Sequence, residues 1–287
     1  MSSETTHLVV QSPALSAEAV EQAAAVAMAN GSFRINATAV RLTDVATDEQ
    51  TRRDVREWCA QAGVDYAYVP ARHRLADYKV LAMDMDSTLI NIECIDEIAD
   101  FIGKKAQVAA ITEAAMRGEI RDFSESLRRR VALLEGTPSE ALERVYEDRL
   151  RLNPGAEKLV EQAHAAGLKV LLVSGGFTYF TDRLRERLSL DAAHANVLEI
   201  DNGVLTGRVL GDIVDAYGKA LHLREFAQRH GARNEQIIAI GDGANDLQML
   251  GLAGISVAYR AKPVVREQTR YALSHSGLDG VLNWFET

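Results

Sequence analysis

The chain has 287 residues, of which 47% are hydrophobic and 25% charged, and this composition is typical of a globular protein rather than a disordered one. Its formal net charge of −9 argues against broad binding to nucleic acids or anionic membranes. No stretch approaches the roughly 18 uninterrupted apolar residues of a membrane helix, the first residues lack a secretory pattern, and Cys59 and Cys94 make no disulfide framework, so we expect a cytoplasmic protein.

Residues 1 to about 75 alternate between strand-like and helix-like segments. A helix is predicted from Ala17 to Asn30, with Gly31 as its stop, and another from Glu49 to Ala62, closed by Gly63. Strands are predicted at Leu8–Val10, Phe33–Leu42 and Val64–Val69. This β-α-β-α-β order predicts a small α+β domain of ferredoxin-like type. The polar stretch 70–74 is interpreted as a linker.

Residues 76–287 predict a second, larger domain. A buried strand at Tyr78–Met85 precedes an almost entirely helical stretch at about residues 94–151. Beyond it we predict helix Gly155–Ala166, strand Leu168–Ser174, helix Phe177–Leu188, hairpin Val197–Leu210, helix Lys219–His230, strand Gln236–Gly241, helix Asn245–Leu252, and short strands at Gly254–Ala258 and near Tyr271. Repeated strand–helix units predict a Rossmann-like α/β core with a parallel sheet, and the helical stretch is interpreted as an inserted cap.

Two aspartates follow the first buried strand of this domain. The apolar run Val80–Met83 leads directly into Asp84, with Asp86 two residues on. Taken alone, such a pair is commonly a solvated or helix-capping pair. Because open α/β sheets place ligands at the carboxyl ends of their strands, the pair is also a candidate for catalysis. Asp84 has the chemistry to attack phosphorus and form an aspartyl phosphate, and Asp86 to protonate the leaving oxygen and then activate water.

A second acidic motif, Gly241-Asp242-Gly243-Ala244-Asn245-Asp246, ends a later apolar strand. The two strand ends are expected to bring Asp84, Asp86 and Asp242 together. Carboxylates gathered this closely repel one another unless a cation neutralises them, and oxygen ligands suit Mg²⁺. The sequence therefore predicts Mg²⁺-assisted phosphate chemistry.

Two further elements suit a phosphate group. Ser174 and Gly175 follow a predicted strand and precede a helix, where a hydroxyl and unhindered amides are available to phosphate oxygens. A Ser-Gly-Gly sequence alone is more often a simple turn. Lys219 is predicted to open the helix after the hairpin and would, without the other motifs, be interpreted as a solvated surface lysine.

These four elements, in this order, resemble the haloacid dehalogenase superfamily. The resemblance implies that Asp84 is the nucleophile and Asp86 the general acid and base. It implies that Asp84, the backbone carbonyl of Asp86 and Asp242 ligate Mg²⁺. The residues implied to bind the phosphate, or to support the lysine and the metal, are Ser174, Gly175, Lys219, Asn245 and Asp246.

Within this superfamily, about residues 78–275 resemble the members that hydrolyse O-phospho-L-serine to serine and phosphate, the last step of serine biosynthesis. The matching segments are Asp84–Glu93, Met116–Gly118, Phe123–Arg130, Val173–Phe177 and Gly241–Asp246. Residues 1–75 resemble the N-terminal extension of bacterial members, which implies an ACT-like domain either for regulation or for dimerisation, and the second of these roles would give a homodimer.

Glu93 and Arg130 are expected to recognise the amino-acid part of this substrate. Arg130 shares a helical stripe with Leu127 and Val131, and an arginine on an apolar face requires an anion such as a carboxylate. Glu93 would then bind the ammonium group. Met116 and Phe123 are implied to line the same pocket. The structural alternative is an ordinary Glu93–Arg130 ion pair.

Three other functions remain open at this point. The same fold would serve a phosphotransferase to another hydroxyl amino acid, or a phosphatase of another small phosphomonoester. An amino-acid-binding regulatory protein is the alternative from another class, although it would not need Asp84. The sequence does not decide whether the N-terminal domain binds serine.

Overall fold

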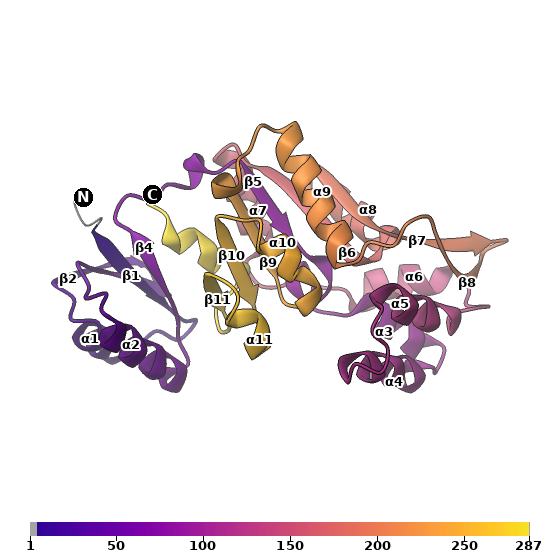
Figure 1. Cartoon of the computed structure of the whole chain (residues 1–287), viewed down its shortest axis with the longest axis horizontal. Helices are drawn as coiled ribbons and strands as arrows, with labels where there is room; N and C mark the ends of the chain where they lie inside the picture. Colours follow the sequence, from indigo (N-terminus) through magenta and orange to yellow (C-terminus); the bar gives the residue numbers. More distant parts are fainter. Residues whose placement is uncertain (1–4, 287) are drawn as a thin grey trace.

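The computed structural model describes residues 5–286, apart from the side chain of Met116. The described chain contains two sheets, one of four strands near the N-terminus and one of seven strands (Figure 1). None of the helices in this part of the chain is long and apolar enough to cross a membrane.

The N-terminal domain is an antiparallel sheet with two helices. Its elements are β1 (Thr6–Gln11), α1 (Ala17–Val26), β2 (Gly31–Asn36), β3 (Ala39–Thr43), α2 (Glu49–Ala62) and β4 (Asp65–Pro70). The strand order is β2-β3-β1-β4. Apolar side chains of β1 and β3 pack with those of α1 and α2 in a separate hydrophobic core. The α+β class predicted for this region is therefore confirmed.

Two local predictions in this domain were wrong. Helix α1 stops at Val26, before Gly31, because Ala27 caps it and Met28 turns the backbone to a φ of +49°. Gly31 instead begins β2. The stretch Phe33–Leu42 is a hairpin rather than one strand, since Asn36 accepts hydrogen bonds from the backbone N–H and the hydroxyl of Thr38 and closes a turn.

The larger domain is built on a sheet with the order β11-β10-β9-β5-β6-β7-β8. Its strands are β5 (Val80–Met83), β6 (Lys169–Phe177), β7 (Ala192–Asp201), β8 (Val204–Leu210), β9 (Ile237–Gly241), β10 (Ile255–Tyr259) and β11 (Tyr271–Leu273). All pairings are parallel except β7 with β8, which form the predicted hairpin. The doubly wound α/β core is confirmed.

Successive side chains of the central strand β5 point to opposite faces of the sheet, and each face is covered by its own layer of helices. Val80 and Ala82 face α9 (Ala216–Arg229) and α10 (Leu247–Leu250), whereas Leu81 and Met83 face α7 (Ala156–Ala165) and α8 (Thr178–Leu188). A strand buried on both faces is apolar throughout, as this one is. The helix predicted at Asn245–Leu252 is shorter than expected, because a 3-10 turn at Ala244–Asp246 precedes α10.

The inserted cap is helical, as predicted. It contains α3 (Cys94–Phe101), α4 (Lys105–Met116), α5 (Phe123–Ala132), α6 (Glu140–Arg144) and a single wide turn at Val145–Arg149. Figure 1 shows these helices together beyond the ends of β5 and β6. Ile98, Val108, Leu127 and Val145 of the cap belong to the same hydrophobic core as the sheet. The cap is therefore packed on the core.

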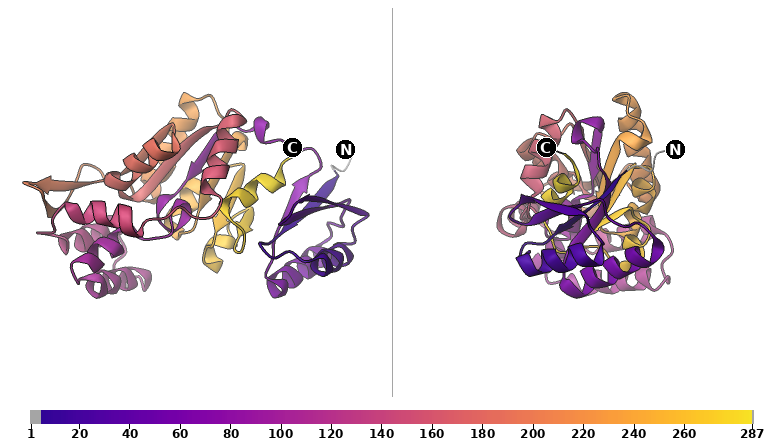
Figure 2. Two further views of the ribbon diagram at one scale, coloured as in Figure 1. Left: turned by 180° about the vertical axis from the view of Figure 1, so that it is seen from behind. Right: turned by 90° about the vertical axis from the view of Figure 1, so that its left-hand side faces the viewer.

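The N-terminal domain lies against the far end of the sheet from the cap (Figure 2). Its Val9 and Val69 share a hydrophobic core with Trp284 and Phe285. Trp284 is the last residue of the 3-10 helix Leu278–Trp284, and Phe285 follows it. The stretch interpreted as a linker takes part in this packing, because the His73 ring lies 4.6 Å from that of Phe285. A 3-10 turn at Leu75–Asp77 follows it. The remaining helix, α11 (Pro263–Arg266), precedes β11.

Candidate active site

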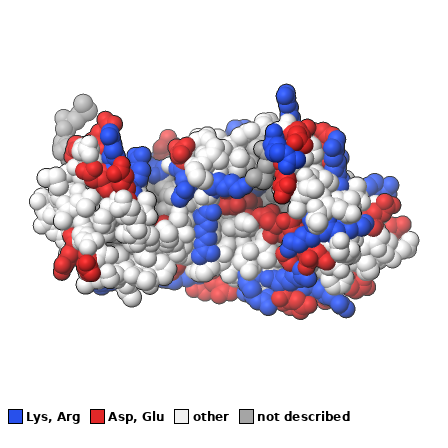
Figure 3. All heavy atoms as spheres, turned by 90° about the horizontal axis from the view of Figure 1, so that it is seen from below, with Lys and Arg blue, Asp and Glu red and all other residues white. Residues whose placement is uncertain are grey.

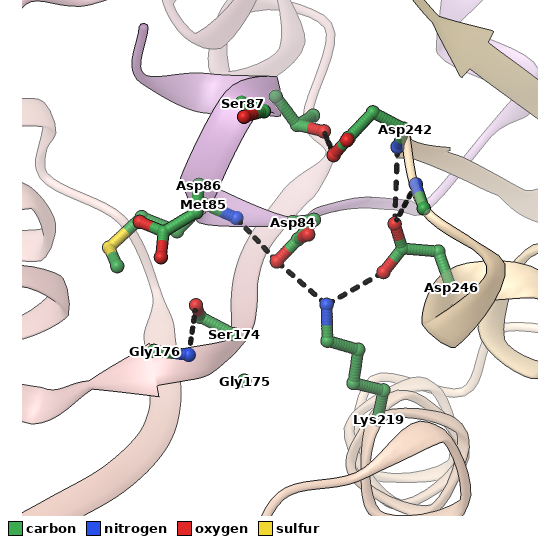
Figure 4. Close-up of polar contacts among 12 residues, drawn as sticks. Asp84, Met85, Asp86, Ser87, Ser174, Gly175, Gly176, Lys219, Asp242 and Asp246 are labelled. Atoms are coloured by element: carbon green, nitrogen blue, oxygen red, sulfur yellow. Dashed lines mark hydrogen bonds and ion pairs between the residues drawn. The ribbon is translucent and has the colours of Figure 1, made fainter. Parts of the chain in front are cut away.

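Three neighbouring strands deliver polar side chains to one edge of the sheet. Asp84 directly follows β5, Asp242 directly follows β9, and Ser174 lies near the carboxyl end of β6. Because β5 pairs in parallel with both β6 and β9, these three side chains are neighbours in space (Figure 4). The edge is the one at which open α/β sheets bind their ligands.

Asp84 is buried and held in a fixed orientation. Its Oδ1 accepts hydrogen bonds from the backbone N–H of Met85, at 2.7 Å, and from Nζ of Lys219, at 2.7 Å. Its Oδ2 has no hydrogen bond within the described part of the chain. Burial raises the pKa of Asp84, the nearby carboxylate of Asp246 raises it further, and Lys219 opposes both effects.

Lys219 is completely buried, which is unusual for a lysine. Its Nζ lies 2.7 Å from Asp84 and 2.6 Å from Oδ1 of Asp246. The two carboxylates raise the pKa of Lys219 and outweigh the opposing effect of burial, so this ammonium stays charged. Lys219 comes from the first turn of α9, which begins at Ala216 behind the capping residue Asp215, three residues earlier than predicted.

Asp246 and Asp242 are joined by the turn between them. Oδ2 of Asp246 accepts hydrogen bonds from the backbone N–H groups of Asp242 and Gly243, while its Oδ1 binds Lys219. Both oxygens of Asp246 are thus occupied. Asp242 has one oxygen bound to the hydroxyl of Thr88, at 2.8 Å. Burial, and then the charge of Asp246, raise the pKa of Asp242 to about 7.

The acidic side chains fit a divalent cation. Carboxylate oxygens of Asp84, Asp242 and Asp246 lie within 4.8 Å of one another. Burial, and then repulsion from the Asp246 carboxylate, raise the pKa values of Asp84 and Asp242, and a bound cation would offset this repulsion. The side chain of Asp86 is outside the cluster, so its expected part in metal binding rests on the backbone carbonyl alone.

Figure 4 shows the Asp86 carboxyl on one side of Asp84, and Asp242 and Asp246 on the other. Oδ2 of Asp86 accepts a long hydrogen bond of 3.4 Å from the backbone N–H of Cys94, and its Oδ1 is buried with no partner among the described residues. Burial, and then the charge of Glu93, raise the pKa of Asp86 to about 8. A Cβ at Gly176 would lie 3.1 Å from Oδ2 of Asp86, so this glycine allows the close approach of β6.

The acids open into a cavity of about 100 Å³ between the core and the cap. The lining side chains that bear on recognition are Glu93, Phe123, Leu127, Arg130, Ser174 and Asn245. Arg130 is half-buried, whereas Arg128 and Arg129 are exposed, as the helical spacing predicts. The described side chains include no Glu93–Arg130 ion pair within 4.0 Å, and Glu93 instead accepts a hydrogen bond of 2.6 Å from Ser87. Both charges therefore remain available to a ligand.

The sequence motifs did not predict the role of two residues near this cavity. Thr88 lies within the segment Asp84–Glu93 and was assigned no role of its own, yet its hydroxyl anchors Asp242. Asn153 is buried, and its Nδ2 donates hydrogen bonds to the backbone oxygens of Thr88, at 2.8 Å, and Ile90, at 2.9 Å. Asn153 thereby holds the loop that follows Asp84 and Asp86. No local signal marks Asn153, since its partners are more than 60 residues away. The Met116 side chain, expected at the cavity, lies outside the described residues.

The sequence profile described as haloacid dehalogenase-like hydrolase matches residues 81–251. A profile described as a domain of unknown function matches residues 8–55. The phosphoserine phosphatase of Polaromonas sp. is 59% identical over 213 residues, which are 73% of this chain and 90% of the relative. That of Albidiferax ferrireducens is 56% identical over 217 residues, which are 74% of this chain and 92% of the relative.

Solved structures extend the similarity to the whole chain. A HAD family hydrolase of Salmonella enterica serovar Typhi superposes with a TM-score of 0.89 at 34% identity, and 99% of each chain is covered. A probable phosphoserine phosphatase of Vibrio cholerae gives a TM-score of 0.84 at 38% identity, covering 98% of this chain and 86% of the other. A phospho-aspartyl intermediate analogue of a phosphoserine phosphatase gives 0.68 at 37% identity, covering 73% of this chain and 99% of the other.

Proposed function

This chain belongs to the phosphoserine phosphatases of the haloacid dehalogenase-like hydrolase family, and we propose that it hydrolyses O-phospho-L-serine with the help of Mg²⁺. The observation that carries the proposal is the buried Asp84–Lys219–Asp246 arrangement beside a cavity in which Glu93 and Arg130 leave each other unpaired. The first set suits phosphoryl transfer, and the second suits an amino acid.

In the first step, we assign the attack on phosphorus to Asp84. One of its oxygens is fixed by Lys219 and Met85, so the other has a defined direction. As the bond from this oxygen to phosphorus forms, the bond from phosphorus to the serine oxygen breaks. Asp86 gives its proton to that leaving oxygen. A carboxyl with a pKa of about 8 holds a proton at neutral pH and is therefore able to do so.

In the second step, the aspartyl phosphate is hydrolysed. Asp86, now a carboxylate, takes a proton from water, and the resulting oxygen attacks phosphorus and releases Asp84. Asp84 and Asp242 would hold Mg²⁺ together with the backbone carbonyl of Asp86, and the bound ion would neutralise charge on the phosphate oxygens. Lys219 places a second positive charge at the same oxygens, while Asp246 keeps its ammonium group in position.

Substrate recognition is assigned to the residues on the other side of the cavity. Arg130 offers its planar guanidinium to the serine carboxylate, and Glu93 accepts from the ammonium group. Ser174, Gly175 and Asn245 face the phosphate from the core side, and Phe123 covers the apolar part of the cavity. A Cβ at Gly175 would lie 3.1 Å from the Phe123 ring, so a larger residue there would narrow the cavity.

None of the described residues of the N-terminal domain, from residue 5 onward, lines this cavity. We therefore place the role of this domain outside the chemical step. The regulatory or dimerising role that the family resemblance implies for this domain remains a prediction, and whether the domain binds serine stays open.

The test is phosphate release from O-phospho-L-serine by the purified chain, with Mg²⁺ or with EDTA. We expect rapid release with Mg²⁺ and almost none with EDTA. A parallel reaction with serine, homoserine and water as competing acceptors distinguishes hydrolysis from phosphotransfer. Formation of phosphohomoserine, or faster release from a phosphomonoester without amino and carboxyl groups, would contradict the proposal.

A further inference from the structure

A second and much larger cleft lies between the two domains. Its volume is about 870 Å³, and it shares no lining residue with the catalytic cavity. Elements α2 and β4 line it on the side of the N-terminal domain, and α11 and β11 on the side of the core. Figure 1 shows α2 and α11 on the same side of the molecule, flanking the junction between the domains.

The lining of this cleft is strongly basic. Four arginines contribute to it, Arg52 and Arg56 from α2, and Arg266 and Arg270 from the segment of α11 and its following turn. The only acids in the lining are Asp65 and Glu267. The chain has a formal net charge of −9, so the positive charge of this lining is opposite in sign to that of the protein as a whole. Figure 3 shows Lys and Arg side chains gathered on this face between the N-terminal domain and the core.

These arginines lack acidic partners. Within the part of the chain that the structure describes, no ion pair joins any of the four to a carboxylate, and the guanidinium groups of Arg56 and Arg266 make no hydrogen bond. The Asp65 carboxylate is turned to the backbone, since its oxygens accept hydrogen bonds from the N–H groups of residues 274–276. Four guanidinium groups thus face the cleft with little compensation.

Two of the arginines are held in place by aromatic rings. Arg52 lies 4.3 Å from the ring centre of Tyr68 and donates to the carbonyl of Thr47. Arg270 lies 5.4 Å from the ring centre of Tyr271 and donates to the carbonyl of Gly254. Their remaining N–H groups are left for a ligand, and a positioned guanidinium loses less entropy on binding than a free one.

The walls of the cleft are also fixed relative to each other. The hydroxyl of Tyr271 donates to the backbone carbonyl of Tyr68, at 2.9 Å, which ties β11 to β4. Arg41 of β3 donates to the carbonyls of Asn283 and Phe285, which also ties the N-terminal domain to the core. A ligand would therefore meet a formed site whose positive charges come from both domains.

We propose that this cleft binds a small molecule that carries a polyphosphate group. Guanidinium groups bind phosphates with paired hydrogen bonds, and charges on two opposing walls suit a ligand with at least two anionic groups. A long nucleic acid is disfavoured, because the basic residues are confined to a concave site on an otherwise acidic protein. Nucleoside triphosphates and inorganic polyphosphate share this chemistry.

The test is isothermal titration calorimetry of the full chain, without added Mg²⁺, using inorganic tripolyphosphate and ATP as separate probes. The variant Arg56→Gln/Arg266→Gln removes the two unpartnered guanidinium groups. The matched control is Arg53→Gln/Arg187→Gln, which removes two exposed arginines of the surface pairs with Glu49 and Glu157. We expect the cleft variant to bind at least tenfold more weakly and the control to stay within twofold of the parent.

Equal affinities for the two probes would assign the site to the phosphates alone, and tighter binding of ATP would assign it to nucleotides. In both cases, higher salt should weaken binding, and the cleft variant should keep its phosphoserine hydrolysis without either probe. The proposal is overturned if neither probe binds below millimolar concentration. It is equally overturned if the cleft variant binds as tightly as the parent, since the probe would then occupy another site.

Discussion

Nζ of Lys219 lies 2.7 Å from Oδ1 of Asp84, and the two side chains are only 1% and 7% exposed. The same ammonium group binds Asp246, so one buried cation stabilises two buried carboxylates. Lys219→Met should leave both acids uncompensated and lower the free energy of unfolding by about 3–5 kcal/mol. It should also lower kcat/KM for phosphoserine more than a hundredfold. Urea unfolding and steady-state kinetics measure the two effects.

Lys158→Met is the control for this variant. Lys158 also forms an ion pair, with Asp279, but its side chain is 60% exposed. Exposed pairs contribute about 0–1 kcal/mol, so the control should match the parent in stability and in kinetics. Similar losses of stability and of kcat/KM in Lys219→Met and Lys158→Met would contradict the role given to Lys219 in the active site.

Arg130→Ala should reduce kcat/KM for phosphoserine by tens- to thousands-fold, since loss of one partner of a desolvated charged contact costs about 2–5 kcal/mol. A phosphomonoester without amino and carboxyl groups should be a poor substrate of the parent, and its kcat/KM should fall much less in the Arg130→Ala variant. Arg130→Lys should not restore activity, because lysine lacks the planar fork. The exposed neighbour Arg129, paired with Glu125, supplies the control Arg129→Ala. Equal losses on both substrates would assign Arg130 a structural role.

The metal-free protein should become less stable as pH rises from about 4 to about 8. Folding raises the pKa of Asp86 to about 8 and of Asp242 to about 7, both from an ordinary value of 3.8. In this interval the unfolded chain has lost these protons and the folded chain retains them, so raising the pH favours unfolding. Asp86→Asn should reduce this decline, and so should added Mg²⁺. Urea unfolding in EDTA at several pH values is the measurement; stability that is constant or increasing would contradict it.

A fragment that begins at Asp77 should retain the catalytic cavity but lose stability. All residues that line the cavity lie at or beyond Asp84. Removal of the N-terminal domain exposes Trp284 and Phe285, which are buried against Val9 and Val69. We expect kcat for phosphoserine to stay within a few-fold of the parent at low temperature, with a clearly lower Tm. A folded fragment without turnover would mean that the N-terminal domain completes the active site.

Runs of apolar residues predicted the architecture correctly, because these runs form the buried strands of the sheet. Residues 80–83 and 237–241 are apolar throughout and are buried on both faces of the sheet. The order of the motifs sufficed to predict that Asp84 and Asp242 meet, because parallel strands end at one edge, but not that Asp246 rather than the Asp86 side chain completes the cluster. Comparison with relatives and solved structures confirms the family and its fold.

Tertiary contacts account for what the sequence did not predict. Gly31 was expected to end a helix, but the backbone had already turned at Met28. The segment 70–74 has polar composition, and its contacts with Phe285 and Tyr78 show why His73 is buried. Asn153 and Thr88 act through partners distant in sequence. The burial of Lys219 likewise depends on Asp84, which follows β5, and on Asp246, in the turn after β9.

The most direct test of the account is the identity of the phosphorylated residue. The parent enzyme is mixed with ³²P-labelled phosphoserine and Mg²⁺, quenched in acid within milliseconds, and the labelled peptide is identified by mass spectrometry. We predict an acyl phosphate on Asp84, formed within one turnover and absent from a folded Asp84→Asn variant. Asp86→Asn should slow both its formation and its hydrolysis. Label on any other residue, or substantial turnover by Asp84→Asn, would contradict this prediction.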